Sequence, residues 1–95
     1  MENVIKVLTD FIETHYPEPC FDWPDFIFEY RVRQRWAAYE VVSAVVNNPE
    51  QPPDQTVEEF LFKMQRFYQE TELRTKEELF SIAVDVAEEL LMLLV

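Results

Sequence analysis

The residues from Asp22 to Asn48 form the longest stretch of the chain without an internal helix breaker, and both tryptophans lie within it. Inside this stretch, residues 26–36 nearly alternate apolar and charged side chains, a pattern typical of a β-strand. The stretch also repeats apolar residues every three or four positions, as one face of an α-helix does. These helical positions are Phe28, Val32, Trp36, Tyr39, Val42 and Val46.

The context of this stretch favours the helix over the strand. A strand needs partner strands, and no other part of the chain has a strand or hairpin pattern. The chain also contains no glycine, which disfavours the tight turns of β-hairpins. At the start of the stretch Asp22 is a good N-cap and Pro24 fits the first helical turn, while Pro49 stops propagation at its end. We therefore predict a helix over residues 22–48.

Three shorter segments have the pattern of amphipathic helices. Residues 1–15 place their apolar side chains on one helical face. Two capping-box sequences, Thr56-Val57-Glu58-Glu59 and Thr75-Lys76-Glu77-Glu78, each indicate the start of a further helix. We expect the first of these helices to end at about Glu72 and the second to continue to the last residue.

Together these segments predict an all-α fold, a single compact four-helix domain over residues 1–95 with a long central helix and no sheet. The hydrophobic content of 48% is far too high for a disordered chain, despite a net charge of −11. A chain of 95 residues is long enough to bury one modest core, and too short for two domains.

The sequence also bears on where the protein is found. Cys20 is the only cysteine, so the chain forms no internal disulfide, as is usual in the reducing cytoplasm. The N-terminal residues interrupt their apolar runs with charges and lack the basic lead of a signal peptide. The longest apolar run, Leu90–Val95, is much shorter than the roughly 20 residues that span a bilayer. We therefore expect a cytoplasmic protein that is not inserted in a membrane.

The acidity of the chain limits its partners. A sequence pI near 4.3 argues against direct binding of DNA or RNA, because such binding needs basic side chains to neutralise phosphates. The same argument applies to the surface of an anionic membrane. An acidic surface is instead compatible with a basic protein partner.

The sequence contains no recognisable catalytic or cofactor motif. His15 and Cys20 could be imagined as a nucleophile pair, but no third group that would orient them is apparent. One histidine and one cysteine are too few for a transition-metal site, and a chain without glycine has no glycine-rich phosphate loop. We therefore predict no enzyme activity, no cofactor and no metal site. His15 is expected to face the C-terminal dipole of its helix, and Cys20 to be a small buried apolar residue.

Two groups of charged residues are candidates for binding a partner. On a helix, Arg31 and Arg35 project together and could anchor an acidic or planar group, although neutralisation of neighbouring acidic helices is the simpler interpretation. Arg33 projects elsewhere, where Glu29 can pair with it. The second group is a stripe of carboxylates on the last helix, which could equally be a solvated face that keeps the protein soluble. Its members are Glu77, Glu78, Asp85, Glu88 and Glu89.

Charge and size lead to two hypotheses about function. The first is a small inhibitor or adaptor whose acidic face binds a basic protein, such as a nuclease or another nucleic-acid-binding protein. Inhibitors from phages or mobile elements and toxin-immunity proteins are of this size and charge, which is an analogy and not a motif. The alternative is a structural homodimer or scaffold subunit, sealed by the apolar C-terminal helix without any electrostatic role.

Overall fold

The structure is a computed structural model that describes residues 2–70 and 74–95, with the side chains of residues 2, 68, 70 and 74–80 left undescribed. It contains four α-helices: α1 (Glu2–His15), α2 (Asp25–Asn47), α3 (Pro53–Glu70) and α4 (Arg74–Leu94). The described residues contain no strand, so the predicted all-α class is confirmed, and residues 26–36 are helical. None of these helices is both long and apolar enough to cross a membrane over the described residues.

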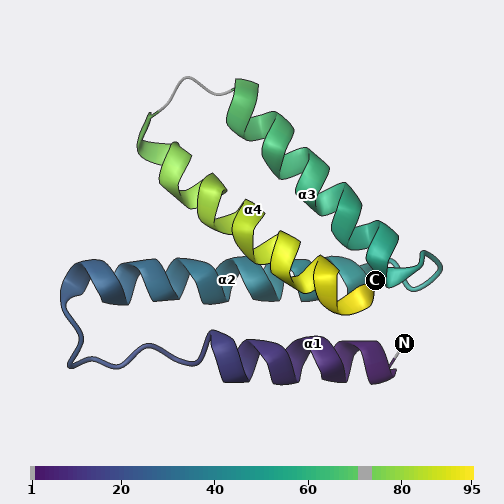
Figure 1. Ribbon diagram of the computed structural model, residues 1–95, viewed down its shortest axis with the longest axis horizontal. Helices are drawn as coiled ribbons and strands as arrows, with labels where there is room; N and C mark the ends of the chain where they lie inside the picture. Colours follow the sequence, from purple (N-terminus) through teal and green to yellow (C-terminus); the bar gives the residue numbers. More distant parts are fainter. Residues whose placement is uncertain (1, 71–73) are drawn as a thin grey trace.

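The four helices form two antiparallel pairs (Figure 1). In the first pair, α1 lies alongside the C-terminal part of α2, while the N-terminal half of α2 extends beyond α1 and lies beside the linker, residues 16–24, that joins the two helices. In the second pair, α3 and α4 run side by side, α4 crosses obliquely over the C-terminal half of α2, and α3 begins beside the C-terminal end of α2. The N-terminal half of α2 therefore has less helical cover than its C-terminal half.

No single helix is the centre of this arrangement. Both α2 and α4 contact all three of the other helices, and their lengths of 23 and 21 residues are similar. The expectation of one long central helix is therefore not confirmed, because the core is shared between the two helices that cross.

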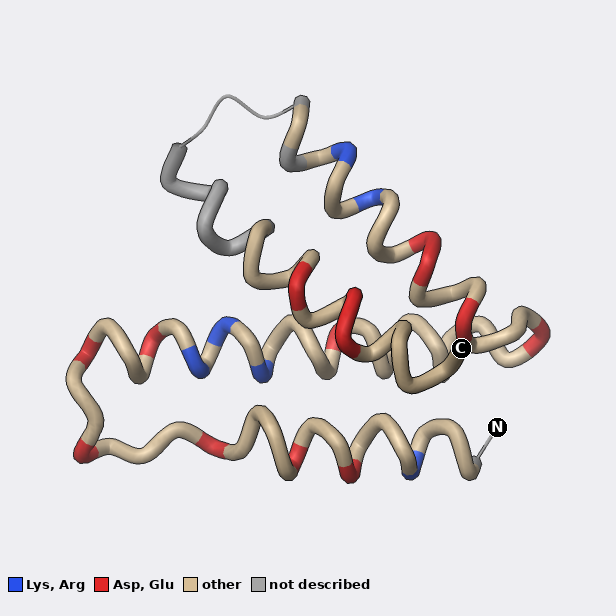
Figure 2. Tube along the Cα trace, viewed as in Figure 1, with Lys and Arg blue, Asp and Glu red and all other residues tan. Residues whose placement is uncertain are grey.

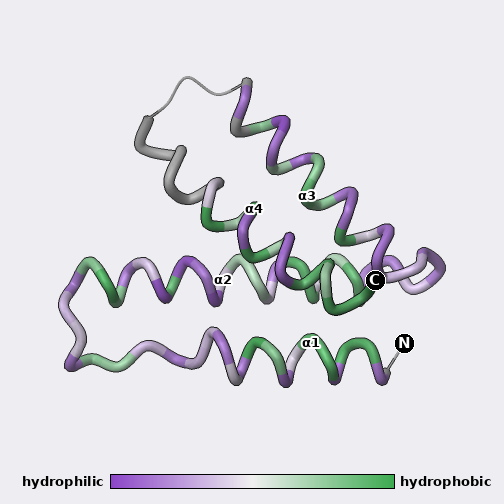
Figure 3. The backbone as a smooth tube through the Cα atoms, viewed as in Figure 1, coloured by the Kyte–Doolittle hydropathy of each residue, from purple (hydrophilic) through white to green (hydrophobic). Residues whose placement is uncertain are grey.

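The core lies where the two helical pairs meet. In Figure 3, hydrophobic segments recur along α1 and along the C-terminal part of α4, where these helices approach α2. The alanines of α2 allow neighbouring helices to approach closely, and each fully buried leucine or valine contributes about 1.5–3 kcal/mol. The fully buried members include Leu8, Ile12, Ala37, Ala38, Val41, Val45, Val57 and Leu90.

The start of α2 differs from the prediction. The helix begins at Asp25, and Pro24 occupies the N-cap position without any side-chain cap. Asp22 is not the N-cap, because it lies in a turn in which the Trp23 amide donates to the Cys20 carbonyl at 3.1 Å. A residue before proline disfavours helical dihedrals, so Trp23 keeps this turn outside the helix.

The start of α3 also differs from the prediction. The helix begins at Pro53, three positions before the expected cap at Thr56. Proline suits the first helical position because its φ is fixed and its missing N–H would have no helical partner. Thr56 is buried in the first turns, where its hydroxyl donates to Gln51 Oε1 at 2.9 Å, and Gln51 Nε2 donates to Glu59 at 2.9 Å. A glutamine from the preceding loop thus takes the place of the predicted capping box. The second capping box and the expected helix end at Glu72 lie outside the described residues and side chains.

The buried side of α2 differs from the apolar face that its sequence periodicity indicated. Of the predicted positions Val42 alone is buried, whereas Trp36 is 53% exposed and Val32 and Val46 are also exposed. The side that packs into the core carries smaller residues, Ala37, Ala38, Val41 and Val45. The apolar periodicity indicated a face with large aromatic side chains. The buried face carries small side chains instead, because the neighbouring helices pack closely against it.

Candidate interaction surface

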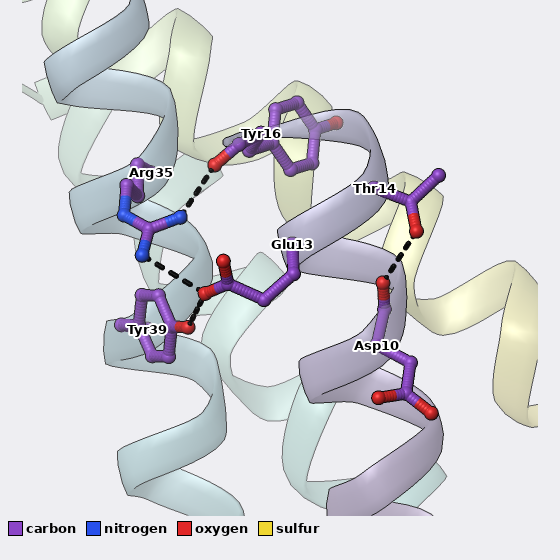
Figure 4. Close-up of polar contacts among 6 residues, drawn as sticks. All are labelled: Asp10, Glu13, Thr14, Tyr16, Arg35 and Tyr39. Atoms are coloured by element: carbon purple, nitrogen blue, oxygen red, sulfur yellow. Dashed lines mark hydrogen bonds and ion pairs between the residues drawn. The ribbon is translucent and has the colours of Figure 1, made fainter. Parts of the chain in front are cut away.

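A polar junction joins the end of α1 to the middle of α2 (Figure 4). Arg35 Nη2 donates to Glu13 Oε1 at 2.9 Å, and Arg35 Nη1 donates to the backbone carbonyl of Tyr16 at 2.9 Å. The Tyr39 hydroxyl donates to the same Glu13 oxygen, and the Arg35 guanidinium lies 5.1 Å from the centre of the Tyr39 ring. Arg35 is therefore occupied by contacts within the chain, as the neutralisation interpretation predicted.

The junction also shifts the pKa values of its members. The hydrogen bond from Tyr39, together with that from Arg35, lowers the pKa of Glu13 below its ordinary value of 4.5. The same hydrogen bond to Glu13, helped by burial, raises the pKa of Tyr39. Both shifts favour a charged carboxylate beside a neutral phenol at neutral pH, which is the state that the hydrogen bonds require.

A second polar contact joins the end of α1 to α4. Tyr16 is buried, and its hydroxyl donates to the carboxylate of Glu89. Burial, and then the hydrogen bond to Glu89, raise the pKa of Tyr16. Glu89 therefore has a role within the fold, which distinguishes it from the other carboxylates of the predicted stripe.

The structure does not give Arg31 and Arg35 a common site. Arg31 is half-buried, and its Nη1 donates to Gln34 Oε1 at 3.1 Å, while Arg35 binds the end of α1. Neither Arg31 nor Arg33 forms an ion pair with a carboxylate in the described part of the chain, so the expected pair between Glu29 and Arg33 is not formed.

Exposed carboxylates remain on α3 and α4. On α4, Asp85 and Glu88 are exposed and, within the described side chains, form neither a hydrogen bond nor an ion pair. On α3, Glu58 and Glu59 are exposed, and Glu59 binds Gln51. Figure 2 shows these acidic positions on the halves of α3 and α4 that lie nearest α2. We call Glu58, Glu59, Asp85 and Glu88 the acidic surface; the predicted Glu77 and Glu78 lie outside the described side chains.

Exposed aromatic residues are the feature that the sequence interpretation missed. In the N-terminal half of α2, Phe26 is 74% exposed and Tyr30 is 46% exposed. Phe21, in the linker, is also exposed and stacks on Phe28 with ring centres 5.6 Å apart. The signal was present in the sequence, because the near-alternation of residues 26–36 distributes apolar side chains around the helix, and one packed face cannot cover them all.

The candidate nucleophiles do not form a site. His15 is exposed and lies against Phe11, with ring centres 4.2 Å apart. Cys20 is exposed, and not buried as expected, and its thiol lies 3.9 Å from Asp22 Oδ2. No hydrogen bond joins His15 to Cys20, and no cluster of His, Cys, Asp and Glu among the described residues is arranged to hold a metal ion.

No protein-family model, curated protein or solved structure matches this chain.

Proposed function

We propose that the protein is a cytoplasmic interaction module, an inhibitor or adaptor whose acidic surface binds a basic protein such as a nuclease or another nucleic-acid-binding protein. The supporting observation is a difference between two sets of carboxylates. Glu13 and Glu89 are used within the fold, whereas Asp85 and Glu88 are exposed without a partner among the described residues. Solvated charges keep a protein soluble, but exposed carboxylates that are not used within the fold are also available to a basic partner.

The spacing of these carboxylates suits a basic partner. Asp85 and Glu88 are three residues apart on α4, so they lie on adjacent turns with Cβ atoms about 5–6 Å apart. This separation approximates that of successive backbone phosphates, which a nucleic-acid-binding protein contacts with lysine and arginine. Complementary charge would also accelerate the encounter of the two proteins, and this effect weakens as salt screens the charges.

A homodimer or scaffold subunit sealed by α4 remains the second candidate. It is favoured by the end of α4, where Met92 is 78% exposed and Leu93 is also exposed. Leu90, however, is buried, and Leu91 and Leu94 pack against the core of the same chain. Over the described side chains of α4, from residue 81 onward, the apolar area offered to a second copy is therefore smaller than the sequence pattern suggested.

The test is charge reversal with a matched control. A partner is first captured from nuclease-treated extract and purified. We expect Asp85→Lys/Glu88→Lys to lower its affinity for the protein at least tenfold at low salt. The control is Glu18→Lys/Glu40→Lys, which changes the net charge equally at exposed positions of the linker and α2. An equal loss in both variants would indicate a general charge effect, and no loss in either would refute the acidic-surface proposal.

A further inference from the structure

The side of α2 that is buried in its C-terminal half continues into the N-terminal half, where its large apolar side chains are exposed. The exposed Phe26 and Tyr30 and the buried Ala37 and Val41 follow one another at intervals of four, seven and four residues. These intervals place all four on one side of the helix. Ile27 lies next to them and is 36% exposed, as against 74% for Phe26. We call Phe26, Ile27 and Tyr30 the α2 patch. These three exposed side chains lie on the half of α2 that extends beyond α1 (Figure 1).

The charges beside this patch have an order. Asp25, Glu29 and Arg33 follow one another at intervals of four residues, so they line one edge of the patch. The two acidic residues come first along the helix and the arginine last. None of the three forms an ion pair in the described part of the chain, although both carboxylates are exposed and Arg33 is half-exposed.

This order of charges on one α2 helix is complementary to the same order on a second α2 helix that runs in the opposite direction. If a second α2 lies antiparallel to the first, the same edge of each helix meets that of the other, with Arg33 of one chain opposite Asp25 and Glu29 of the other. In a parallel two-fold arrangement this edge would instead face the opposite edge of the other helix, so Arg33 would not meet Asp25 or Glu29. A two-fold symmetric interface requires a surface of this kind, in which one patch fits its own copy. Residues 22–48 are also nearly neutral, with four acidic side chains and three arginines, so two copies can approach here despite a net charge of −11 on each chain.

We propose that the α2 patch binds a second copy of this chain, with the two α2 helices antiparallel. Phe26, Ile27 and Tyr30 of both copies form the centre of the contact, and Arg33 of each chain pairs with Asp25 and Glu29 of the other. A stable interface of standard size buries about 800 Å² of each partner, and three side chains with their flanking charges supply less than that. The dimer is therefore weak and depends on concentration.

This dimer is independent of the acidic surface. Asp85 and Glu88 lie on α4 and remain exposed, so the dimer would present two acidic surfaces to basic partners. The two proposals are also tested by different substitutions. Phe26→Glu leaves Asp85 and Glu88 unchanged, and Asp85→Lys/Glu88→Lys leaves the α2 patch unchanged. Failure of one proposal therefore leaves the other standing.

The first experiment is sedimentation velocity over a series of protein concentrations. We expect the wild-type chain to shift from monomer to dimer, and Phe26→Glu to weaken the dimer at least tenfold. Phe62→Glu is the matched control, because Phe62 is also exposed, at 65%, but lies on α3. Circular dichroism confirms that each variant is folded. A wild-type chain that stays monomeric throughout, or a dimer that Phe26→Glu leaves intact, would overturn the proposal.

The second experiment tests the antiparallel pairing by exchanging the charges. Arg33→Glu makes the edge of the patch wholly acidic, and Asp25→Lys/Glu29→Lys makes it wholly basic, so each variant alone should remain monomeric. Mixed in equal amounts, the two variants should form a mixed dimer, because both contacts across the two-fold axis are then complementary. A mixture that stays monomeric would refute the pairing. A dimer that is abolished by Met92→Glu and not by these changes would place the contact on α4 and refute the patch.

Discussion

The two halves of α2 belong to one continuous helix, yet they relate to the rest of the protein in opposite ways. The N-terminal half carries the larger side chains, including Phe26, Tyr30 and Trp36, and leaves them largely exposed. The C-terminal half carries alanines and valines, and buries Ala37, Ala38 and Val41 completely. Burial in this helix therefore follows the position of the crossing helices and not the hydrophobicity of the side chain. A large residue needs space, and the space beside a close helix crossing suits a small one.

The largest effect on stability is expected from a charge placed in the buried half of α2, compared with the same charge in the exposed half. Val41→Asp introduces a carboxylate into the fully buried half, and we expect it to lower the free energy of unfolding by about 3–5 kcal/mol because the charge has no partner. Val32→Asp makes the same change on the exposed face and should cost less than about 1 kcal/mol. Urea denaturation followed by circular dichroism measures both. Similar losses in the two variants would contradict the contrast between the halves.

A smaller effect is expected from added volume at the crossing. Ala38→Leu should destabilise the protein by about 1–3 kcal/mol, because the neighbouring helices leave no room for the larger side chain. Ser43→Leu adds a similar side chain at an exposed position of the same helix and should change stability by about 0.5 kcal/mol or less. If thermal unfolding shows Ala38→Leu to be neutral, the crossing is looser than the structure indicates.

The smallest effect concerns the polar junction near the boundary between the halves. The pKa of Glu13 is lowered in the folded protein, so its contribution to stability is present above its ordinary value of 4.5 and is lost as the pH falls through the lower folded value. We expect Glu13→Gln to be less stable than wild type at neutral pH, and this difference to shrink in acid. Thermal unfolding at a series of pH values measures it. A difference that grows on acidification would contradict the assigned shift.

The sequence predicted the helices better than it predicted their ends and faces. The absence of glycine and of strand patterns was sufficient for an all-α fold, because each remaining segment had helical periodicity. The starts of α2 and α3 were misplaced because Pro24 and Pro53 determine them, whereas the prediction relied on Asp22 and Thr56 as caps. The buried face of α2 depends on which helices cross it, and no local pattern contains that information.

For the candidate surface, the sequence indicated which carboxylates lie on the polar side of α4 but not which of them are used within the fold. Asp85 and Glu88 are exposed, as their position on the helix suggested. Glu89 is a neighbour in sequence, but its contact with Tyr16 spans 73 residues. Arg35 likewise meets Glu13 across 22 residues. Such contacts arise from the arrangement of helices, so a periodicity argument cannot separate a side chain that binds internally from one that faces solvent.

The contact between Tyr16 and Glu89 also bears on the order in which the protein assembles. Each helical pair can form by closing a short connection, but this hydrogen bond joins α1 to α4 and encloses most of the chain, which carries the larger entropic cost of a long loop. We therefore expect the two helical pairs to form first and α1 to dock on α4 late. By the same reasoning, the contact between the end of α1 and α4 is where the folded protein would begin to open.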